Sequence, residues 1–240
     1  SRGLVGSEMC IRDRFEKIWI VACGTAYHAG LFGKDLFEKV LGVPVSVELA
    51  SEFRYREPII GKNDLAIVIS QSGETMDTIA ATELLKENGS HVLALVNVVG
   101  SSLARMADSV FYLHVGPEIG VASTKAYLGM LVGQLLLAKH WDSNNKLDTS
   151  LEEIKALPSL IEEALKCEDQ VKQISKLIYK KKDIYFIGRG LDYALAAEGA
   201  LKLKEISYLH AEALAAGELK HGTLALIEEG TPAVSYTHLR

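Results

Sequence analysis

LAIVISQSGET, residues 65–75, joins an apolar run to a hydroxyl-rich turn. The run carries no charge after Asp64, which is typical of a strand covered on both faces of a parallel sheet. The turn contains Ser70, Gln71, Ser72, Gly73 and Thr75, and the residues after it have helical spacing. Because backbone N–H groups gather at a helix start, such a turn suits a phosphate dianion. No Lys or Arg lies in the turn, so hydroxyls and peptide dipoles would hold the anion.

A second strand–turn–helix pattern precedes this one. IWIVA at 18–22 leads into the turn 23–26, which includes Thr25, and helical spacing follows. Polar turns after two parallel strands would flank one crevice of an open α/β sheet. Glycine and serine also favour ordinary βα turns for conformational reasons alone, so the turns by themselves leave both interpretations open.

The chain up to residue 142 continues the alternation. Strand-like runs occur at 18–22, 45–49, 65–70, 92–97 and 110–115, with helical patterns between most of them. This order predicts an α/β fold in which right-handed crossovers place helices on both faces of a parallel sheet. We expect residues 15–142 to form the first domain.

A second unit follows a polar connection. We expect a linker and a charged helix over 143–180, with Pro158 at a helix start or at a break. The run 184–190 repeats the strand and glycine turn of 18–24, and helical spacing then extends over 191–216. The pattern therefore indicates an internal repeat of the first strand–turn–helix unit.

Little apolar sequence remains after this predicted helix. LALI at 224–227 and TPAV at 231–234 are the remaining candidates for strands. A sheet as large as the first cannot be completed from them. We therefore expect 181–234 to form a truncated second domain that leaves apolar surface uncovered.

The composition argues against several classes of function. The chain has 240 residues and a net charge of −5, without the basic block that a nucleic-acid partner would require. Its three cysteines have no metal-ligand or disulfide spacing, which fits a reducing, cytoplasmic setting. The apolar stretch 128–141 is too short to cross a membrane, so we expect no membrane partner.

One helix face in the second unit carries candidate catalytic groups. Glu198, Lys202 and Glu205 are spaced i, i+4 and i+7 and share this face. Apolar neighbours favour partial burial, and a buried carboxylate beside an ammonium can be tuned for proton transfer. A solvated face with a salt bridge has the same spacing. His221, in the loop beyond, is either part of this group or an exposed histidine.

Several segments together resemble the isomerizing glutamine–fructose-6-phosphate aminotransferases, the glucosamine-6-phosphate synthase family. The resemblance covers residues 15–234 and rests on CGTAYHAG (23–30), ELASEFRYR (48–56), SQSGET (70–75), GSSLAR (100–105), GPEIGVASTKAY (116–127), EGALKLKEISYLHAEA (198–213) and GELKHG (217–222). Colinear agreement of long motifs is specific, whereas SQSGET alone indicates only a sugar isomerase (SIS) domain. The resemblance implies an SIS-type three-layer sandwich with a parallel sheet, and a second, truncated SIS domain.

The resemblance also implies which residues form the site. Substrate-binding positions would be Thr25, Ser70, Gln71, Ser72, Thr75, Val121, Ala122 and Ser123. Glu205 would move a proton between C1 and C2 of the sugar, and Lys202 would assist at the sugar oxygens. His221 would open the sugar ring, reaching in from the neighbouring subunit of a homodimer. Substrate and product would be fructose 6-phosphate and glucosamine 6-phosphate, with no metal or redox cofactor.

Parts of the family pattern are not found. No segment before Phe15 could form the family's glutaminase domain, and the tail whose lysine forms a Schiff base with the ketose is not found. We therefore expect this chain to be inactive alone. The segments 1–14 and 235–240 resemble translated sequencing-adapter sequence and are expected to be non-native ends.

Two other functions fit parts of the sequence. One is a non-catalytic, regulatory SIS domain that senses a sugar phosphate. The helix that carries Glu205 favours an enzyme instead, because sensing alone needs no base. The other is a dinucleotide-binding fold, which is disfavoured because the glycines of 23–30 and 188–190 do not form G-x-G-x-x-G.

Overall fold

The computed structural model describes residues 15–236, and the chain divides between Leu147 and Asp148 into two compact units. The segment 1–14, which includes Cys10, lies outside the described residues, as does 237–240. Each unit has its own sheet and its own core.

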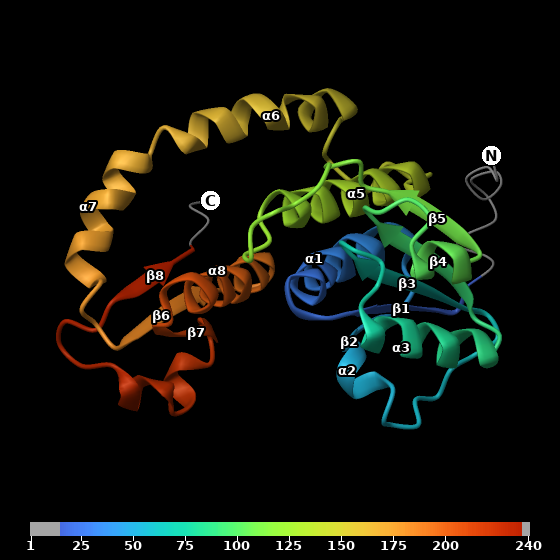
Figure 1. The fold of residues 1–240 in the computed structure, drawn as a ribbon, viewed down its shortest axis with the longest axis horizontal. Coiled ribbons are helices and arrows are strands. Elements are labelled where there is room, and N and C mark those ends of the chain that lie inside the picture. The colour runs from blue at the N-terminus through green and yellow to red at the C-terminus, as the bar shows by residue number, and fades with distance from the viewer. Residues whose placement is uncertain (1–14, 237–240) are drawn as a thin grey trace. The chain divides into compact units, whose positions relative to one another are not determined.

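The first unit is built on a parallel sheet of five strands in the order β2-β1-β3-β4-β5 (Figure 1). The strands are β1 (Lys17–Ala22), β2 (Val45–Leu49), β3 (Asp64–Ser70), β4 (His91–Val96) and β5 (Ser109–Tyr112). The helices are α1 (Gly24–Leu41), α2 (Ala50–Phe53), α3 (Met76–Glu87), α4 (Ser102–Met106) and α5 (Lys125–Trp141). The predicted α/β fold with a parallel sheet is confirmed.

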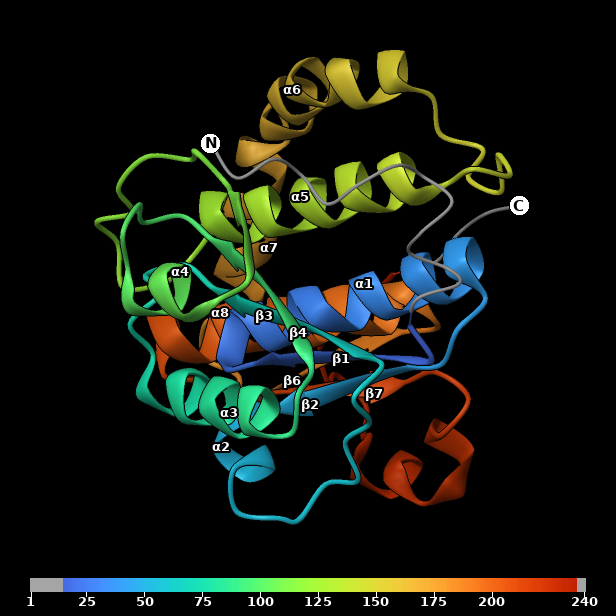
Figure 2. The same ribbon diagram turned by 90° about the vertical axis from the view of Figure 1, so that its right-hand side faces the viewer.

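Helices cover both faces of this sheet, which makes three layers. Figure 2 shows α1 and α5 on one side of the strands and α2 and α3 on the other. Two separate cores result, one containing Ile20 and Phe37 and the other containing Phe53 and Val68. Strand β3 is buried along its whole length, as its uncharged sequence predicts for a strand covered on both faces.

The strand order creates a crevice at one edge of the sheet. Strand β1 pairs with β2 on one side and with β3 on the other. The carboxyl ends of β1 and β3 therefore lead into α1 and α3, which pack on opposite faces of the sheet. Such a topological switch point is where open α/β sheets bind their ligands.

Strand β5 ends earlier than its sequence predicts. The strand expected over 110–115 is observed only to Tyr112, and His114 has a left-handed backbone with φ of 54°. A β-strand cannot continue through that conformation. The chain therefore leaves the sheet at this point and forms the loop 113–124 that leads to α5.

The second unit has a smaller parallel sheet of three strands in the order β7-β6-β8. Its elements are α6 (Leu151–Leu165), α7 (Glu168–Ile178), β6 (Asp183–Gly188), α8 (Leu191–Ser207), β7 (His210–Ala215), the 3₁₀ turns Leu219–His221 and Thr223–Leu226, and β8 (Ala233–Ser235). Its core contains Ile184 and Phe186 of β6 packed against alanines of α8 and β7. The strand, glycine turn and helix of β6 and α8 repeat those of β1 and α1.

The predicted helix over 191–216 is wrong beyond Ser207. Tyr208 adopts a left-handed conformation with φ of 60° and ends α8. The residues that follow form β7, which pairs with β6 along its whole length. The predicted strand at 224–227 is also wrong, because most of it lies in a 3₁₀ turn.

Pro158 neither starts nor breaks a helix, so that prediction is wrong too. Helix α6 runs through it from Leu151 to Leu165. The helix starts at a capping box, in which Ser150 and Glu153 each accept a hydrogen bond from the backbone of the other. Proline removes one amide donor from the interior of this helix. The break comes later, before α7 begins at Glu168.

Candidate functional site

A cavity of about 210 Å³ lies at the switch point of the first unit. The turn after β1, the end of β3 with the turn after it, the end of the loop before α5 and α5 itself contribute its lining: Cys23, Thr25, Ala26, Ile69, Ser70, Gln71, Ser72, Thr75, Ser123 and Met130. The five substrate-binding residues predicted in the two turns all lie in this lining, and Ser123 joins them. These side chains come from segments far apart in the chain, so the fold brings them together.

The turn after β3 presents its hydroxyl groups as donors. Ser70 Oγ accepts a hydrogen bond from Gly73 N at 3.0 Å, and Ser72 Oγ accepts one from the N–H group of Glu74 at 3.1 Å. Ser70 Oγ and Thr75 Oγ1 are 3.1 Å apart, so one of these two hydroxyls donates to the other and the second keeps its proton. A hydroxyl that accepts from the backbone keeps its proton for another partner. The turn is therefore suited to an acceptor-rich anion.

Close packing fixes the shape of this turn. Gly73 has φ of 68°, and a Cβ at this position would lie 2.1 Å from Ser101 Oγ. Leu103 N donates to the Gly73 carbonyl at 3.1 Å, and Ser102 N donates to Glu74 Oε1 at 2.8 Å. Hydrogen bonds from Ser102 hold the pKa of Glu74 below its ordinary value, so this carboxylate is charged at neutral pH.

Two helices begin at the cavity with their positive ends. Neither α1 nor α3 has a side-chain hydrogen bond at its N-cap, and the first turn of α1 has no acidic residue. Asp77, in the first turn of α3, is paired with Arg54 at 2.8 Å. The amides and dipoles of both helix starts therefore favour an anion in the cavity.

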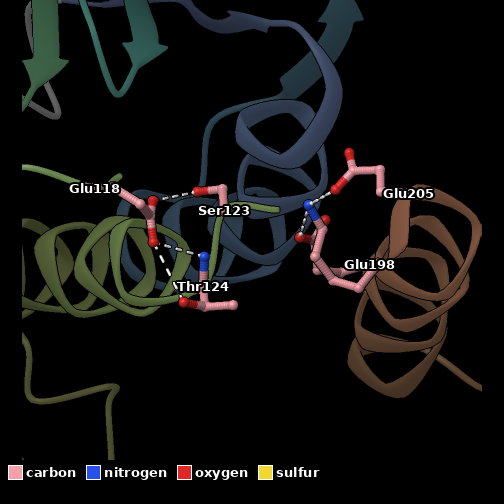
Figure 3. Close-up of polar contacts among 6 residues, drawn as sticks. Glu118, Ser123, Thr124, Glu198 and Glu205 are labelled. Atoms are coloured by element: carbon pink, nitrogen blue, oxygen red, sulfur yellow. Dashed lines mark hydrogen bonds and ion pairs between the residues drawn. The ribbon is translucent and has the colours of Figure 1, made fainter. Parts of the chain in front are cut away.

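The cavity lining has a different polarity at Ser123. Ser123 Oγ donates to Glu118 Oε2 at 2.7 Å, and Thr124 N donates to Glu118 Oε1 at 2.8 Å (Figure 3). Burial opposes ionisation of this carboxyl, but the donors on Thr124, Ser123 and Ala126 outweigh it and hold the pKa of Glu118 below its ordinary value. A carboxylate thus lies behind Ser123.

Two predicted substrate residues do not line this cavity. Val121 is 95% exposed, and Ala122 is partly buried in the same loop. A second cavity of about 510 Å³ lies alongside and shares Gln71 with the first. It is lined by Gln71, Asn97, Val98, His114, Gly116, Pro117 and Glu118.

The predicted catalytic pair lies on α8 of the second unit. Lys202 Nζ is 2.5 Å from Glu205 Oε2 and 3.5 Å from Glu198 Oε1, so one ammonium lies between two carboxylates (Figure 3). The Glu198 side chain is 5% exposed and that of Glu205 is 30% exposed. The i, i+4 spacing to Lys202 had placed Glu198 on this face, although the family resemblance assigned it no role. This ammonium can stabilise negative charge beside Glu205.

His221 lies in the second unit, exposed, at the end of the 3₁₀ turn Leu219–His221. Its backbone N–H group donates to Glu218 O at 2.9 Å. The role predicted for it in a neighbouring subunit stays a prediction.

The described residues offer neither a membrane-spanning helix nor a metal site. Between residues 15 and 236, no helix is both long enough and apolar enough to span a bilayer. The same residues hold no cluster of His, Cys, Asp and Glu suited to a metal ion. Cys23 and Cys167 are free thiols.

The profile of one protein family, the SIS domain, matches residues 12–139 and 177–238. The chain belongs to the SIS domain family. The predicted SIS-type fold is therefore confirmed. Both units of this SIS protein contribute to the match, since the two matched segments fall on either side of 140–176.

The relatives of this SIS protein include isomerizing aminotransferases. Over 229 residues it is 55% identical to the glutamine–fructose-6-phosphate aminotransferase (isomerizing) of Clostridium acetobutylicum, an alignment that spans 93% of this chain and 38% of the relative. The corresponding enzyme of Pyrococcus horikoshii is 50% identical over 224 residues, with 92% and 38% covered. The resemblance inferred from the sequence motifs is confirmed, and the chain spans little more than a third of these relatives' length.

Solved structures agree with the sequence comparison. The C-terminal domain of glucosamine-fructose-6-phosphate aminotransferase from Francisella tularensis superposes with a TM-score of 0.89 at 44% identity, covering 94% of this chain and 65% of that one. Tagatose-6-phosphate ketose/aldose isomerase from Escherichia coli has a TM-score of 0.73 at 18% identity, covering 94% and 64%. Because this second structure is only 18% identical, its similarity concerns the fold alone.

Proposed function

We propose that the chain is the isomerase region of a glutamine–fructose-6-phosphate aminotransferase and that its first unit binds fructose 6-phosphate. The observation that carries this proposal is the cavity at the switch point. Its hydroxyls, together with two helix starts, meet at the carboxyl ends of β1 and β3. Phosphate is the ligand group whose charge and acceptors match these donors.

The chemistry of the second unit supports an isomerase over a sensor. In the proposed reaction, Glu205 takes a proton from C1 of the open-chain ketose and returns it to C2, so that the carbonyl moves from C2 to C1. Negative charge develops on the sugar oxygens in between, and Lys202 would stabilise it. Lys202 is 2.5 Å from Glu205, so the base and the cation form one preorganised group.

The remaining parts of the proposal concern assembly and setting. His221 would open the sugar ring across the interface of a homodimer, because imidazole exchanges protons near neutral pH. Its exposed position in the second unit is compatible with such a contact. We also propose a cytoplasmic setting, which suits the free thiols Cys23 and Cys167.

Binding measurements on the full chain test the phosphate site. Calorimetric titration should detect fructose 6-phosphate and inorganic phosphate but not NAD. Ser72→Ala should weaken fructose 6-phosphate binding about tenfold or more, because a hydrogen bond to a charged group is lost. Ser143→Ala, an exposed serine next to the linker, is the matched control and should leave the affinity unchanged. Binding of NAD without binding of either phosphate ligand would overturn the proposal.

A further inference from the structure

Glu118 contacts Ser123, which lines the first unit's cavity together with the turn after β3. Its carboxylate accepts from Ser123 Oγ at 2.7 Å, from Thr124 N at 2.8 Å and from Thr124 Oγ1 at 3.3 Å. The carboxylate itself lines the second, larger cavity, whereas Ser123 lines the first. Glu118 therefore lies behind the hydroxyl that a bound ligand would meet.

This contact fixes the polarity of Ser123. A serine hydroxyl has one proton and two lone pairs. The carboxylate can only accept, so the single proton of Ser123 is committed to it. Towards the cavity, Ser123 has only lone pairs left. It can accept a hydrogen bond from a ligand hydroxyl, and it cannot donate one to a phosphate oxygen.

The serines of the turn after β3 have the reverse arrangement. Ser72 Oγ accepts from Glu74 N, and Ser70 Oγ accepts from Gly73 N, so backbone donors occupy lone pairs there. Ser70 and Thr75 share one further hydrogen bond, so the proton of Ser72 and one proton of the Ser70–Thr75 pair remain for the cavity. One cavity thus has a donor side at the turns and an acceptor at Ser123.

The charges around the cavity differ between the turns and Ser123 in the same way. Glu118 accepts hydrogen bonds from the backbone at the start of α5, so that helix start already has an anion of the protein's own. The starts of α1 and α3 have no side-chain cap. An incoming phosphate would meet positive helix ends at the turns and a carboxylate behind Ser123.

We propose that Glu118 is a specificity-determining positioning residue, which holds Ser123 as a hydrogen-bond acceptor. It thereby admits the hydroxyl-bearing end of the ligand beside Ser123 and directs the phosphate to the turns after β1 and β3. The inference rests on the proposed function, because it assumes a sugar phosphate in this cavity. Glu118 touches no ligand in this role and acts through Ser123.

The test compares two probes, fructose 6-phosphate and inorganic phosphate, titrated into the full chain. Glu118→Gln keeps the shape and one acceptor, but it removes the charge and frees the Ser123 proton. We expect it to weaken the binding of fructose 6-phosphate about three- to tenfold, which corresponds to the loss of one hydrogen bond. Affinity for inorganic phosphate should stay within about twofold of the unsubstituted chain or become tighter.

Three further variants separate positioning from simple support of the loop. Ser123→Ala should weaken the binding of fructose 6-phosphate by a factor similar to that of Glu118→Gln. The double variant should bind fructose 6-phosphate no more weakly than the single variant with the lower affinity. Thr124→Val is the matched control. It removes the 3.3 Å contact to the same carboxylate and leaves Ser123 in place. The affinities for fructose 6-phosphate and for inorganic phosphate should therefore stay unchanged. Melting temperatures identify any variant that fails to fold.

Each outcome decides the question. Equal weakening of both probes by Glu118→Gln would mean that Glu118 only supports the loop, and unchanged affinity for both would mean that it has no role in binding. Additive losses in the double variant would likewise overturn the inference. If the unsubstituted chain binds neither probe, the proposed function fails first and this inference fails with it.

Discussion

At the scale of single residues, the shape of the turn after β3 depends on one glycine. Gly73 needs a left-handed backbone, and its Cα also faces the Ser101 hydroxyl so closely that a Cβ would lie 2.1 Å from Ser101 Oγ. Gly100 has a similar φ of 73° but open space around it. Substitutions at these two glycines therefore separate the cost of the left-handed backbone from the cost of close packing.

Gly73→Ala should destabilise the chain more than Gly100→Ala does. Both variants bear the left-handed penalty of about 1–2 kcal/mol. Only Gly73→Ala adds a clash with buried Ser101. This overpacking should cost a further 1–3 kcal/mol or so. Urea unfolding of the two variants gives the difference in free energy. Equal losses would mean that Ser101 moves aside freely and that close packing does not fix the turn.

At the scale of elements, the end of α5 is held by a buried carboxylate. Asp142 accepts from Lys146 N and from Leu147 N, both at 2.8 Å, and its side chain is fully buried. Burial opposes its charge, but donation from Leu147 and Lys146 outweighs that effect and holds the pKa of Asp142 below its ordinary value. The segment after α5 is thereby packed on the first unit, with Leu147 in the core.

The lowered pKa of Asp142 makes its contribution to stability depend on pH. Because the folded state favours the charged form, the contribution is complete above the ordinary pKa of about 3.9 and is lost as the pH falls through the lower folded value. Asp142→Asn should therefore reduce the free energy of unfolding by about 1–3 kcal/mol at pH 7, and the gap to the unsubstituted chain should narrow below pH 4 or so.

Urea unfolding at a series of pH values measures this gap. Asp35→Asn, on the exposed face of α1, is the matched control and should show little change at any pH. A gap that stays constant down to pH 3 would contradict the role assigned to the Asp142 charge.

At the scale of the whole molecule, the proposed reaction requires groups from two copies of the chain. In the full-length enzyme, Glu205→Gln should reduce exchange of the C1 proton of fructose 6-phosphate with D2O by about 10²–10⁴-fold, and His221→Ala should also reduce it. When the two inactive variants are mixed and allowed to exchange subunits, each mixed dimer should contain one intact site. About a quarter of the unsubstituted rate should then return.

Nuclear magnetic resonance follows the exchange, and differential tagging verifies that mixed dimers have formed. No recovery in verified mixed dimers would mean that Glu205 and His221 of one chain serve the same site. Normal exchange in Glu205→Gln would mean that another group is the base, and no exchange in the unsubstituted protein would instead favour the non-catalytic sugar-phosphate sensor.

The sequence by itself determined the class of fold and the family. Uncharged runs such as 65–69 and the glycine turns after them are local signals, because burial on both faces and tight turns restrict which residues can occur. The same signals located the turns that line the cavity, since the order of elements in a parallel sheet brings strand ends to one edge.

Only the tertiary structure decided the features that depend on distant partners. The sequence of β7 is compatible with a helix, and pairing with β6 makes it a strand. Burial of Glu198 and the polarity of Ser123 likewise depend on contacts that spacing does not reveal. A hydroxyl is a donor or an acceptor according to which neighbour takes its proton, and for Ser123 that neighbour is Glu118, placed by the fold of the loop before α5.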